Sequence, residues 1–436
     1  MKKRTSIFSK IFKKKEEIES NITYNKYGYS EVIYQNDHTV LVHDSCRICY
    51  NKVMEKSFEE RIKYIEDKVK LKHTSILEHS NVIMRLSLTK EAYPELAEVL
   101  SISKYLNVKI VETEDRIEIL IGGSIRGYRH IIENITNPKN IVYSVIRDNL
   151  YQLPSCYFVD MIEEGIFNKN LFNNFDIRVN IELNETTGEI SSKSRNNGKK
   201  VRKDKYDIVG MDDIEEVYKL ANRYEELFTI DDILDMVTIS VLFKGVSRTA
   251  SHQLVRHRAG ITQLSQRYVN MKDSKFLSPE EFKPEKYDAN TKYKINIDGI
   301  EKELTLKEIG KLELNIYEQL LEQGLLREDA RSFLPSNIET SLYMTFTFRN
   351  FIKFLELRTG KGAQAEIKQL AEALKEDFEL HQCKYIGEDI YSYLIPKYNR
   401  ISMDLVTMGE ANIDEVIAVE EELLPNEDLK LKTKEI

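Results

Sequence analysis

The segment from Met236 to Tyr268 constrains the fold most, because its pattern predicts a strand followed at once by a helix. Its first part, MVTISVLF, alternates β-branched residues in the manner of a strand. From Val246 onwards the apolar residues recur at helical spacing, so that one side can pack inward while the other stays polar. We therefore expect a strand that leads into an amphipathic helix.

The polar face of this predicted helix is rich in hydrogen-bond donors. Gln253, Arg256 and His257 stand at positions i, i+3 and i+4, which share one side of a helix. Further donors extend the array past the helix: Arg258, Ser265, Gln266 and Arg267. Because a guanidinium matches phosphate oxygens two at a time, the pattern favours a phosphorylated ligand. A solvated basic face is the alternative.

Composition excludes several classes of protein. The 436 residues are enough for two or three domains with ample core. The 64 basic and 72 acidic residues leave a net charge of −8, which does not favour nucleic acid as the partner. No apolar run approaches the roughly twenty residues of a membrane helix, and the basic N-terminus lacks the apolar core of a secretion signal. We therefore expect a cytoplasmic protein without a membrane span.

The four cysteines, at positions 46, 49, 156 and 383, point to a reduced compartment and not to a disulfide framework. Cys46 and Cys49 form a C-x-x-C pair, which could serve zinc binding or redox chemistry. No second pair or histidine cluster completes a zinc site in the sequence. We expect no metal.

Two basic stretches stand apart from the globular pattern. Residues 1–30 combine lysines with scattered apolar residues, which suits a solubilising tail or an amphipathic segment that touches anionic lipid or a partner. Residues 168–206 predict a flexible, exposed basic loop. That loop could bind RNA, but no aromatic residues alternate with its charges to stack bases, which favours a solvated loop.

Apolar periodicity and turn residues predict further elements. IEILIGGSIRGYRHII at 117–132 joins a strand to a helix and echoes TFTFRNFIKFLELR at 345–358, which hints at a duplicated piece. The polar stretch 272–302 predicts a surface excursion. The remaining predicted elements are a strand over 82–88, a helix over 304–326 that closes at Gly324, a strand over 340–348, and helices over 349–358 and 363–374.

Three blocks of the sequence resemble the flavin-dependent thymidylate synthases. RHR at 256–258 followed by SQRY at 265–268 resembles the family's signature, although six residues separate the two here where the family has seven. HTSILEH at 73–79 is similar to the family's His-x-Thr/Ser-x-x-Glu-His segment, which helps to hold the flavin. Residues 327–374 are similar to its C-terminal half, in the elements R-x-x-L-P, L-R and A-Q-x-E-I.

The resemblance implies an α+β fold with a flavin-dependent thymidylate synthase-like core, in which a mixed sheet packs with helices. This core would comprise residues 31–88 and 230–385. Residues 89–229 would be a long insertion of mixed α/β character, because compact members run almost directly from the Glu-His pair to the RHR helix. Residues 386–436 would be a C-terminal extension.

The resemblance also implies a reaction. The protein would methylate dUMP to dTMP, with 5,10-methylenetetrahydrofolate as the carbon donor and a hydride that passes from NADPH through FAD. It further implies a homotetramer with active sites shared between subunits. No cysteine lies in the donor array to attack the uracil ring, whereas a guanidinium beside the ring would stabilise charge that develops in the transition state. Arg358 matches the arginine placed against the uracil and is the expected catalytic residue.

The matched motifs assign two sets of binding residues. The residues expected to hold dUMP are Gln253, Arg256, Gln263, Ser265, Gln266, Arg267, Arg331 and Arg358. The residues expected to line FAD are Ser75, Glu78, Arg256, His257, Arg258, Gln263, Thr347, Arg349 and Lys353. Thr347, Lys353 and Gly362 depart from the residues common in the family. The alternative is a catalytically impaired relative that binds a nucleotide or RNA as a regulatory protein.

Overall fold

The structure is a computed structural model that describes residues 22–35, 38–51, 56–172, 205–283 and 285–385. The chain divides into two compact units, Met1–Phe351 and Ile352–Ile436. Antiparallel sheets and helices occur together, as expected for the α+β class. Among the described residues, no helix is long and apolar enough to cross a membrane.

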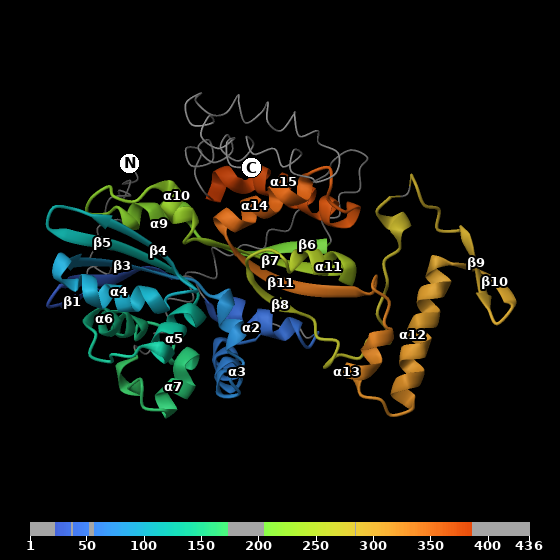
Figure 1. The fold of residues 1–436 in the computed structure, drawn as a ribbon, viewed down its shortest axis with the longest axis horizontal. Coiled ribbons are helices and arrows are strands. Elements are labelled where there is room, and N and C mark those ends of the chain that lie inside the picture. The colour runs from blue at the N-terminus through green and yellow to red at the C-terminus, as the bar shows by residue number, and fades with distance from the viewer. Residues whose placement is uncertain (1–21, 36–37, 52–55, 173–204, 284, 386–436) are drawn as a thin grey trace, which may run out of the picture. The chain divides into compact units, whose positions relative to one another are not determined.

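The first sheet of the larger unit uses the blue and teal strands of Figure 1. Its strands lie in the order β1-β2-β3-β5-β4, and every neighbouring pair is antiparallel. In the central pair, Val82 faces Gly123 and Thr89 faces Arg116. The strands are β1 Ile22–Asn25, β2 Gly28–Gln35, β3 Val82–Thr89, β4 Asn107–Glu112 and β5 Arg116–Gly123.

The second sheet of the same unit has the order β6-β7-β11-β8 and is also antiparallel (Figure 1). Its central pair aligns Ile239 with Phe346 and Phe243 with Leu342. A separate hairpin joins β9 to β10. The strands are β6 Tyr206–Met211, β7 Thr238–Ser247, β8 Gly260–Gln263, β9 Lys292–Ile297, β10 Ile300–Thr305 and β11 Glu339–Thr347.

The helices begin and end where local chemistry dictates. Helix α12, for example, starts at a capping box in which Thr305 and Glu308 exchange hydrogen bonds, and it stops before Gly324, whose φ of +91° suits glycine. The α-helices are α2 His38–Ile48, α3 Phe58–Lys70, α4 Tyr93–Ile102, α5 Ile125–Asn134, α6 Ile141–Leu150, α7 Val159–Glu163, α9 Ile214–Ala221, α10 Ile230–Leu234, α11 Arg248–Leu254, α12 Leu306–Glu322, α13 Arg327–Ala330, α14 Phe348–Thr359 and α15 Ala365–Tyr385. The 3₁₀ helices are η1 Thr74–His79, η2 Lys90–Ala92, η3 Ser155–Phe158, η4 Lys169–Leu171, η6 Pro279–Glu281 and η7 Arg331–Phe333.

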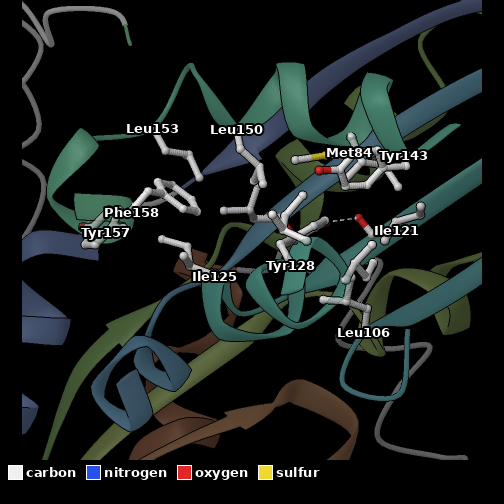
Figure 2. Close-up of a cluster of buried hydrophobic side chains, with 14 of the residues drawn as sticks. Met84, Leu106, Ile121, Ile125, Tyr128, Tyr143, Leu150, Leu153, Tyr157 and Phe158 are labelled. Atoms are coloured by element: carbon white, nitrogen blue, oxygen red, sulfur yellow. Dashed lines mark hydrogen bonds between the residues drawn. The ribbon is translucent and has the colours of Figure 1, made fainter. Parts of the chain in front are cut away.

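A hydrophobic core packs strands β3 and β5 against helices α5 and α6 (Figure 2). Tyr128 of α5 is fully buried there, and its hydroxyl lies 3.1 Å from the carbonyl oxygen of Val82 and 2.9 Å from that of Ile121. The buried ring therefore keeps its polar atom satisfied while it joins the helix to both central strands.

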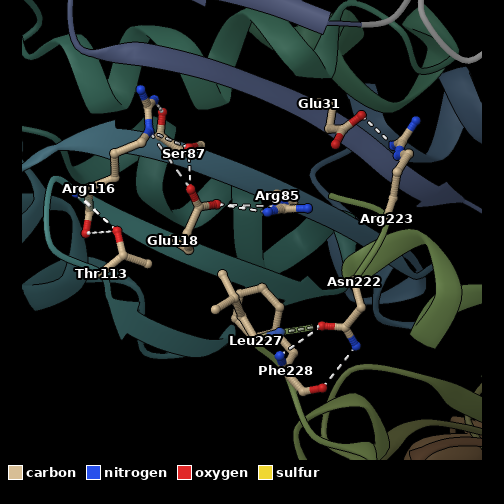
Figure 3. A network of polar contacts seen from close by, with 10 residues as sticks. All are labelled: Glu31, Arg85, Ser87, Thr113, Arg116, Glu118, Asn222, Arg223, Leu227 and Phe228. Atoms are coloured by element: carbon tan, nitrogen blue, oxygen red, sulfur yellow. Dashed lines mark hydrogen bonds and ion pairs between the residues drawn. The ribbon is translucent and has the colours of Figure 1, made fainter. Parts of the chain in front are cut away.

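A charged network lies within the same sheet (Figure 3). Arg85 of β3 is 1% exposed and lies 3.0 Å from a carboxylate oxygen of Glu118 on β5. Arg223 forms an ion pair with the buried Glu31 of β2. Because buried charges are costly without partners, the Arg85–Glu118 pair favours the pairing of β3 with β5, and the Arg223–Glu31 pair ties the turn after α9 to β2.

Most predicted elements are confirmed. The expected strands over 82–88 and 340–348 are β3 and β11, and the strand-to-helix unit at 117–132 is β5 followed by α5. The helix that closes at Gly324 is α12. The surface excursion expected at 272–302 ends in the β9–β10 hairpin, whose described side chains are mostly exposed.

The expected division of the chain stays a prediction. Strands β4 and β5, which fall in the expected insertion, join the sheet that holds β2 and β3. The end of the expected tail forms β1 and the start of β2. Most of the predicted basic loop and the whole of 386–436 lie outside the described residues.

Candidate functional site

The RHR residues lie just beyond α11 and not on it. The helix ends at Leu254, and the N–H of His257 donates to the Leu254 carbonyl at 3.1 Å within a turn. The prediction that Gln253, Arg256 and His257 share a helix face is therefore wrong. Pairing of β8 with β11 draws the chain out of the helix, so tertiary contacts override the local spacing. The turn exposes Arg256 and Arg258.

A second group of donors gathers around Arg248, the first residue of α11. Its guanidinium donates to Oε1 of the buried Gln266 at 2.6 Å, and burial together with the nearby Arg331 lowers the pKa of Arg248. Arg267 and Arg331 donate to the side chain and the backbone carbonyl of Glu328, at 2.9 and 3.1 Å. Nε2 of Gln266 has no hydrogen-bond partner among the described residues. Adjacent cations beside such a buried donor suit an anionic ligand.

Gln263 and Ser265 lie at the end of β8, between α2 and β11. The amide Nε2 of Gln263 donates to Oγ of Ser251 at 3.0 Å and to Oγ1 of Thr340 at 3.2 Å. The N–H of Ser265 donates to the carbonyl of Cys49 at 3.1 Å. Burial raises the pKa of Cys49 to about 11, so its thiol is protonated, and the backbone carbonyl of Cys49 anchors this loop.

The HTSILEH segment meets β8 and β11 through His79. The imidazole hydrogen-bonds to the hydroxyl of Thr262 on β8 and lies 2.9 Å from that of Thr345 on β11. Burial lowers the pKa of His79 to about 3, because an enclosed imidazolium would lose its hydration. His79 is therefore neutral and fixes the segment against the second sheet.

Glu78 lies where the HTSILEH segment passes the start of β8. A side chain at Gly260 would place its Cβ 2.8 Å from the carbonyl oxygen of Glu78, so only glycine allows this approach. The Glu78 carboxylate forms an ion pair with Arg126 of α5. Ser75 is exposed. The structure thus brings the HTSILEH segment next to the strand that follows the RHR turn.

Two of the predicted flavin residues have roles inside the protein. Oγ1 of Thr347 accepts a hydrogen bond from the N–H of Asn350 at 3.4 Å and so caps α14. Nε of Arg349 donates to Asp235 at 2.6 Å, and its NH2 group lies 3.7 Å from a carboxylate oxygen of Asp231. Both side chains are half-buried.

Arg358 and Lys353 belong to the second unit, where both lie on α14. Lys353 is exposed and Arg358 is half-buried. The expected catalytic residue is thus in a different unit from the donors around Arg248.

A cavity of about 320 Å³ opens beside β8 and β11, and Leu264, Asp273, Glu339 and Ser341 are among the residues that line it. None of the residues predicted for dUMP or FAD lines this cavity. Within the described ranges, no group of three or more His, Cys, Asp or Glu could hold a metal ion.

Sequence reasoning missed Arg248. The signal was present, since Arg248 follows the β7 strand within the same donor-rich stretch as RHR. Its partner Gln266 could not be inferred from spacing, because the two are joined only when β8 turns back along β11.

Comparison with known families gives the class of this region. Residues 186–381 match the family model described as thymidylate synthase complementing protein. The matched region holds the RHR turn, the Arg248 cluster and α14, but not the HTSILEH segment. The match confirms the resemblance predicted from the sequence.

Curated relatives bear the more particular name. The chain is similar to the flavin-dependent thymidylate synthases of Thermococcus onnurineus (32% identity over 148 residues, 32% of this chain and 54% of the relative), Mycobacterium tuberculosis H37Rv (32% over 144 residues, 32% and 56%) and Pyrococcus furiosus (30% over 152 residues, 34% and 57%). The chain spans about half the length of these relatives. Since their name is that of an enzyme, the comparisons do not favour the alternative of a non-catalytic binding protein.

Proposed function

We propose that the protein methylates dUMP to dTMP, with 5,10-methylenetetrahydrofolate as the carbon donor, NADPH as the source of the hydride and FAD as the bound cofactor. The similarity of residues 186–381 to flavin-dependent thymidylate synthases supports this reaction. The observation that carries the proposal is the cluster of Arg248, Gln266 and Arg331. In this cluster two cations and an unpaired buried amide donor converge, as the phosphate of a nucleotide requires.

The nucleotide would be held by donors around this cluster. Arg248 and Arg331 supply guanidinium groups, and Gln266 supplies the free amide donor. Gln263 has its amide N–H groups engaged by the protein, so its carbonyl Oε1 would accept from the ligand. The remaining expected dUMP contacts are Gln253, Arg256, Ser265, Arg267 and Arg358.

Arg358 would act as the catalytic residue. A guanidinium against the uracil stabilises negative charge on the ring as the methyl group is transferred, which lowers the barrier most where water is excluded. The flavin, when bound, supplies the hydride that completes the methyl group. The other residues bind and orient, which alone contributes several kcal/mol to catalysis.

The residues at the HTSILEH and RHR segments fit a flavin. Ser75, Arg256 and Arg258 are exposed donors, and the neutral His79 holds their two segments together. Hydroxyl and guanidinium groups suit the phosphates of FAD. The other expected flavin contacts are Glu78, His257, Gln263, Thr347 and Lys353, whereas Arg349 is engaged by Asp235.

The proposal extends to assembly and location. We expect a homotetramer with shared active sites in the cytoplasm, as the resemblance implies. The mass in solution, compared with 51.1 kDa for one chain, tests the assembly directly.

Two measurements test the function. Purified protein should be yellow with bound flavin, and it should release tritium from dUMP labelled at C5 when NADPH and the folate are supplied. Arg358→Ala should abolish tritium release and keep the flavin, because Arg358 acts on the uracil. Lys368→Ala is the matched control, since it removes a cation from the same unit that pairs, among the described residues, with the exposed Glu372. A colourless wild-type protein, after flavin has been offered, would overturn the proposal.

A further inference from the structure

The two sheets of the larger unit share one register, apart from a shift in β11 between Thr340 and Leu342 that has no counterpart in β5. In each sheet, the strand before the central pair carries a bulge at the same place, between Val32 and Tyr34 in β2 and between Ile208 and Gly210 in β6. A slip of one residue would turn every side chain to the other face, so agreement across four strands is specific. The aligned rows are Val32, Met84, Ile121 and Val108 in the first sheet, and Ile208, Val241, Met344 and Ile261 in the second.

Local contacts repeat at the positions that this register makes equivalent. Ser124 accepts from the N–H of Gly127 at 3.3 Å and caps α5, while Thr347 accepts from the N–H of Asn350 at 3.4 Å and caps α14. Ser124 directly follows β5, and Thr347 is the last residue of β11. The first half of the unit, residues 28–134, and the second half, residues 206–351, therefore have the same strand-to-helix geometry.

The ion pairs of these helices repeat as well. Arg126, two residues after the first cap, pairs with Glu78, and Arg349, two residues after the second cap, pairs with Asp235. Both carboxylates lie just before the second strand of their own half, β3 or β7. The segments that carry them read HTSILEH at 73–79 and IDDILDM at 230–236.

The two halves exchange these segments. His79 of the first half bonds to Thr345 in the second sheet, and Met236 of the second half lies against Gly122 in the first sheet. By the shared register, Thr345 and Gly122 are equivalent positions. Each half thus inserts its segment against the sheet of the other, which gives two junctions in one chain. We name the contact of 73–79 with 256–263 the first junction and that of 230–236 with 103–110 the second.

The functional motifs are divided unequally between these junctions. At the first junction, HTSILEH meets the strand that follows RHR. At the second, the three residues equivalent to RHR are Ser103, Lys104 and Tyr105. The charges there satisfy each other, because Lys109 lies 3.3 Å from Asp232 and 3.6 Å from Asp235. The acidic segment disfavours an anionic ligand.

The first half also lacks a counterpart of the segment that carries the donors expected to bind the nucleotide. In the second half, residues 264–338 run between β8 and β11 and carry the donors Gln266, Arg267 and Arg331. In the first half, only residues 113–115 join β4 to β5, in a hairpin closed by the N–H of Thr113 and the carbonyl of Arg116. A cluster of nucleotide-binding side chains like that of Arg248, Gln266 and Arg331 therefore cannot form at the second junction.

We propose that residues 28–134 and 206–351 are two copies of one structural repeat. Each chain then builds one site for flavin and nucleotide, which lies at the first junction. In this site, Arg126 takes the place expected for Arg349. This proposal rests on the function proposed above and specifies its site. Arg126 reaches Glu78 at the first junction, whereas Arg349 is held by Asp235 at the second.

The test uses the full-length protein and a matched pair of variants, Arg126→Ala and Arg349→Ala. Each removes the same side chain from an equivalent position and breaks the equivalent ion pair. Arg126→Ala should weaken FAD binding by at least about tenfold, the size of one charge-assisted hydrogen bond, while Arg349→Ala should leave it within about twofold. Melting curves show whether each variant is folded.

Ligand counts provide the second arm. Flavin absorbance and a calorimetric titration with dUMP should each give one ligand per chain. Two ligands per chain, or loss of FAD from Arg349→Ala but not from Arg126→Ala, would overturn the assignment of the site. A folded wild-type protein that binds neither FAD nor dUMP would instead overturn the proposed function, and the site with it.

Discussion

The first and second junctions have the same backbone geometry but opposite surface chemistry. At the first, a neutral His79 is buried between two threonine hydroxyls, and Arg256 and Arg258 are exposed nearby. At the second, Met236 fills the equivalent place and Lys109 is paired with aspartates. The same backbone arrangement can therefore present exposed basic side chains at one junction and charges that pair with each other at the other. The charged residues at each junction decide between the two.

The largest expected effect tests how far the two sheets are interchangeable. Leu242 occupies the position equivalent to the buried Arg85, and Ser341, which lies at the register shift of β11, corresponds to Glu118 by chain count. Arg85→Leu should cost about 3–5 kcal/mol of unfolding free energy, because it leaves a buried carboxylate without its main partner. Arg85→Leu with Glu118→Ser copies the second sheet and should recover part of that loss, as measured by urea denaturation. A double variant less stable than Arg85→Leu would count against the equivalence.

The pH dependence of stability should differ between the junctions because of His79. Its pKa is about 3 in the folded protein, below the roughly 6.5 of an unfolded histidine. The unfolded state therefore binds the proton first, and stability is lost as pH falls from about 6.5 towards 3, by about 1.4 kcal/mol per pH unit for this group. His79→Met, which copies Met236, should flatten this part of a stability-against-pH profile. An unchanged slope would show that other groups govern acid unfolding.

The equivalent ion pairs should differ in strength. Arg349 and Asp235 are each 24% exposed in their side chains, whereas Arg126 is 46% exposed. Arg349→Met should cost about 1–3 kcal/mol, since it removes charge-assisted hydrogen bonds from a half-buried aspartate. Arg126→Met should cost less than about 1 kcal/mol, as exposed pairs do. Chemical denaturation of the two variants measures the difference, and equal losses would contradict this ranking.

The smallest expected effect concerns the two helix caps. Ser124→Ala and Thr347→Ala should each destabilise the protein by about 1 kcal/mol, because each frees one backbone N–H at a helix start. Thermal unfolding should show similar shifts for both. Ser101→Ala is a control, since Ser101 is exposed and its hydroxyl donates to a carbonyl near the end of α4 without capping a helix start.

The sequence predicted local structure well where pattern and packing agree. The short apolar, β-branched runs of β3, β7 and β11 and the apolar stripe of α12 were readable, because the runs are buried almost throughout and the stripe faces the core. The helix through Arg256 and His257 was predicted wrongly, since donors in a short turn happen to have helical spacing. The likeness of residues 117–132 to 345–358 was also visible, and the shared register gives it a structural counterpart in α5 and α14.

The site could be predicted only as separate motifs. RHR, HTSILEH and Arg331 were readable as ligand chemistry, because guanidinium and hydroxyl groups recur at marked positions. Arg248 and its bond to Gln266 were not, since β8 must pair with β11 before the two meet. That Arg349 is bound by Asp235 also needed the structure.

The sequence by itself determined which segments are strands and helices and which side chains can bind an anion, because both depend on residue type and short-range spacing. Only the tertiary structure decided which motif meets which. His79 finds its partners on strands far along the chain, and the exchange of segments between halves depends on strand pairing that no local pattern encodes.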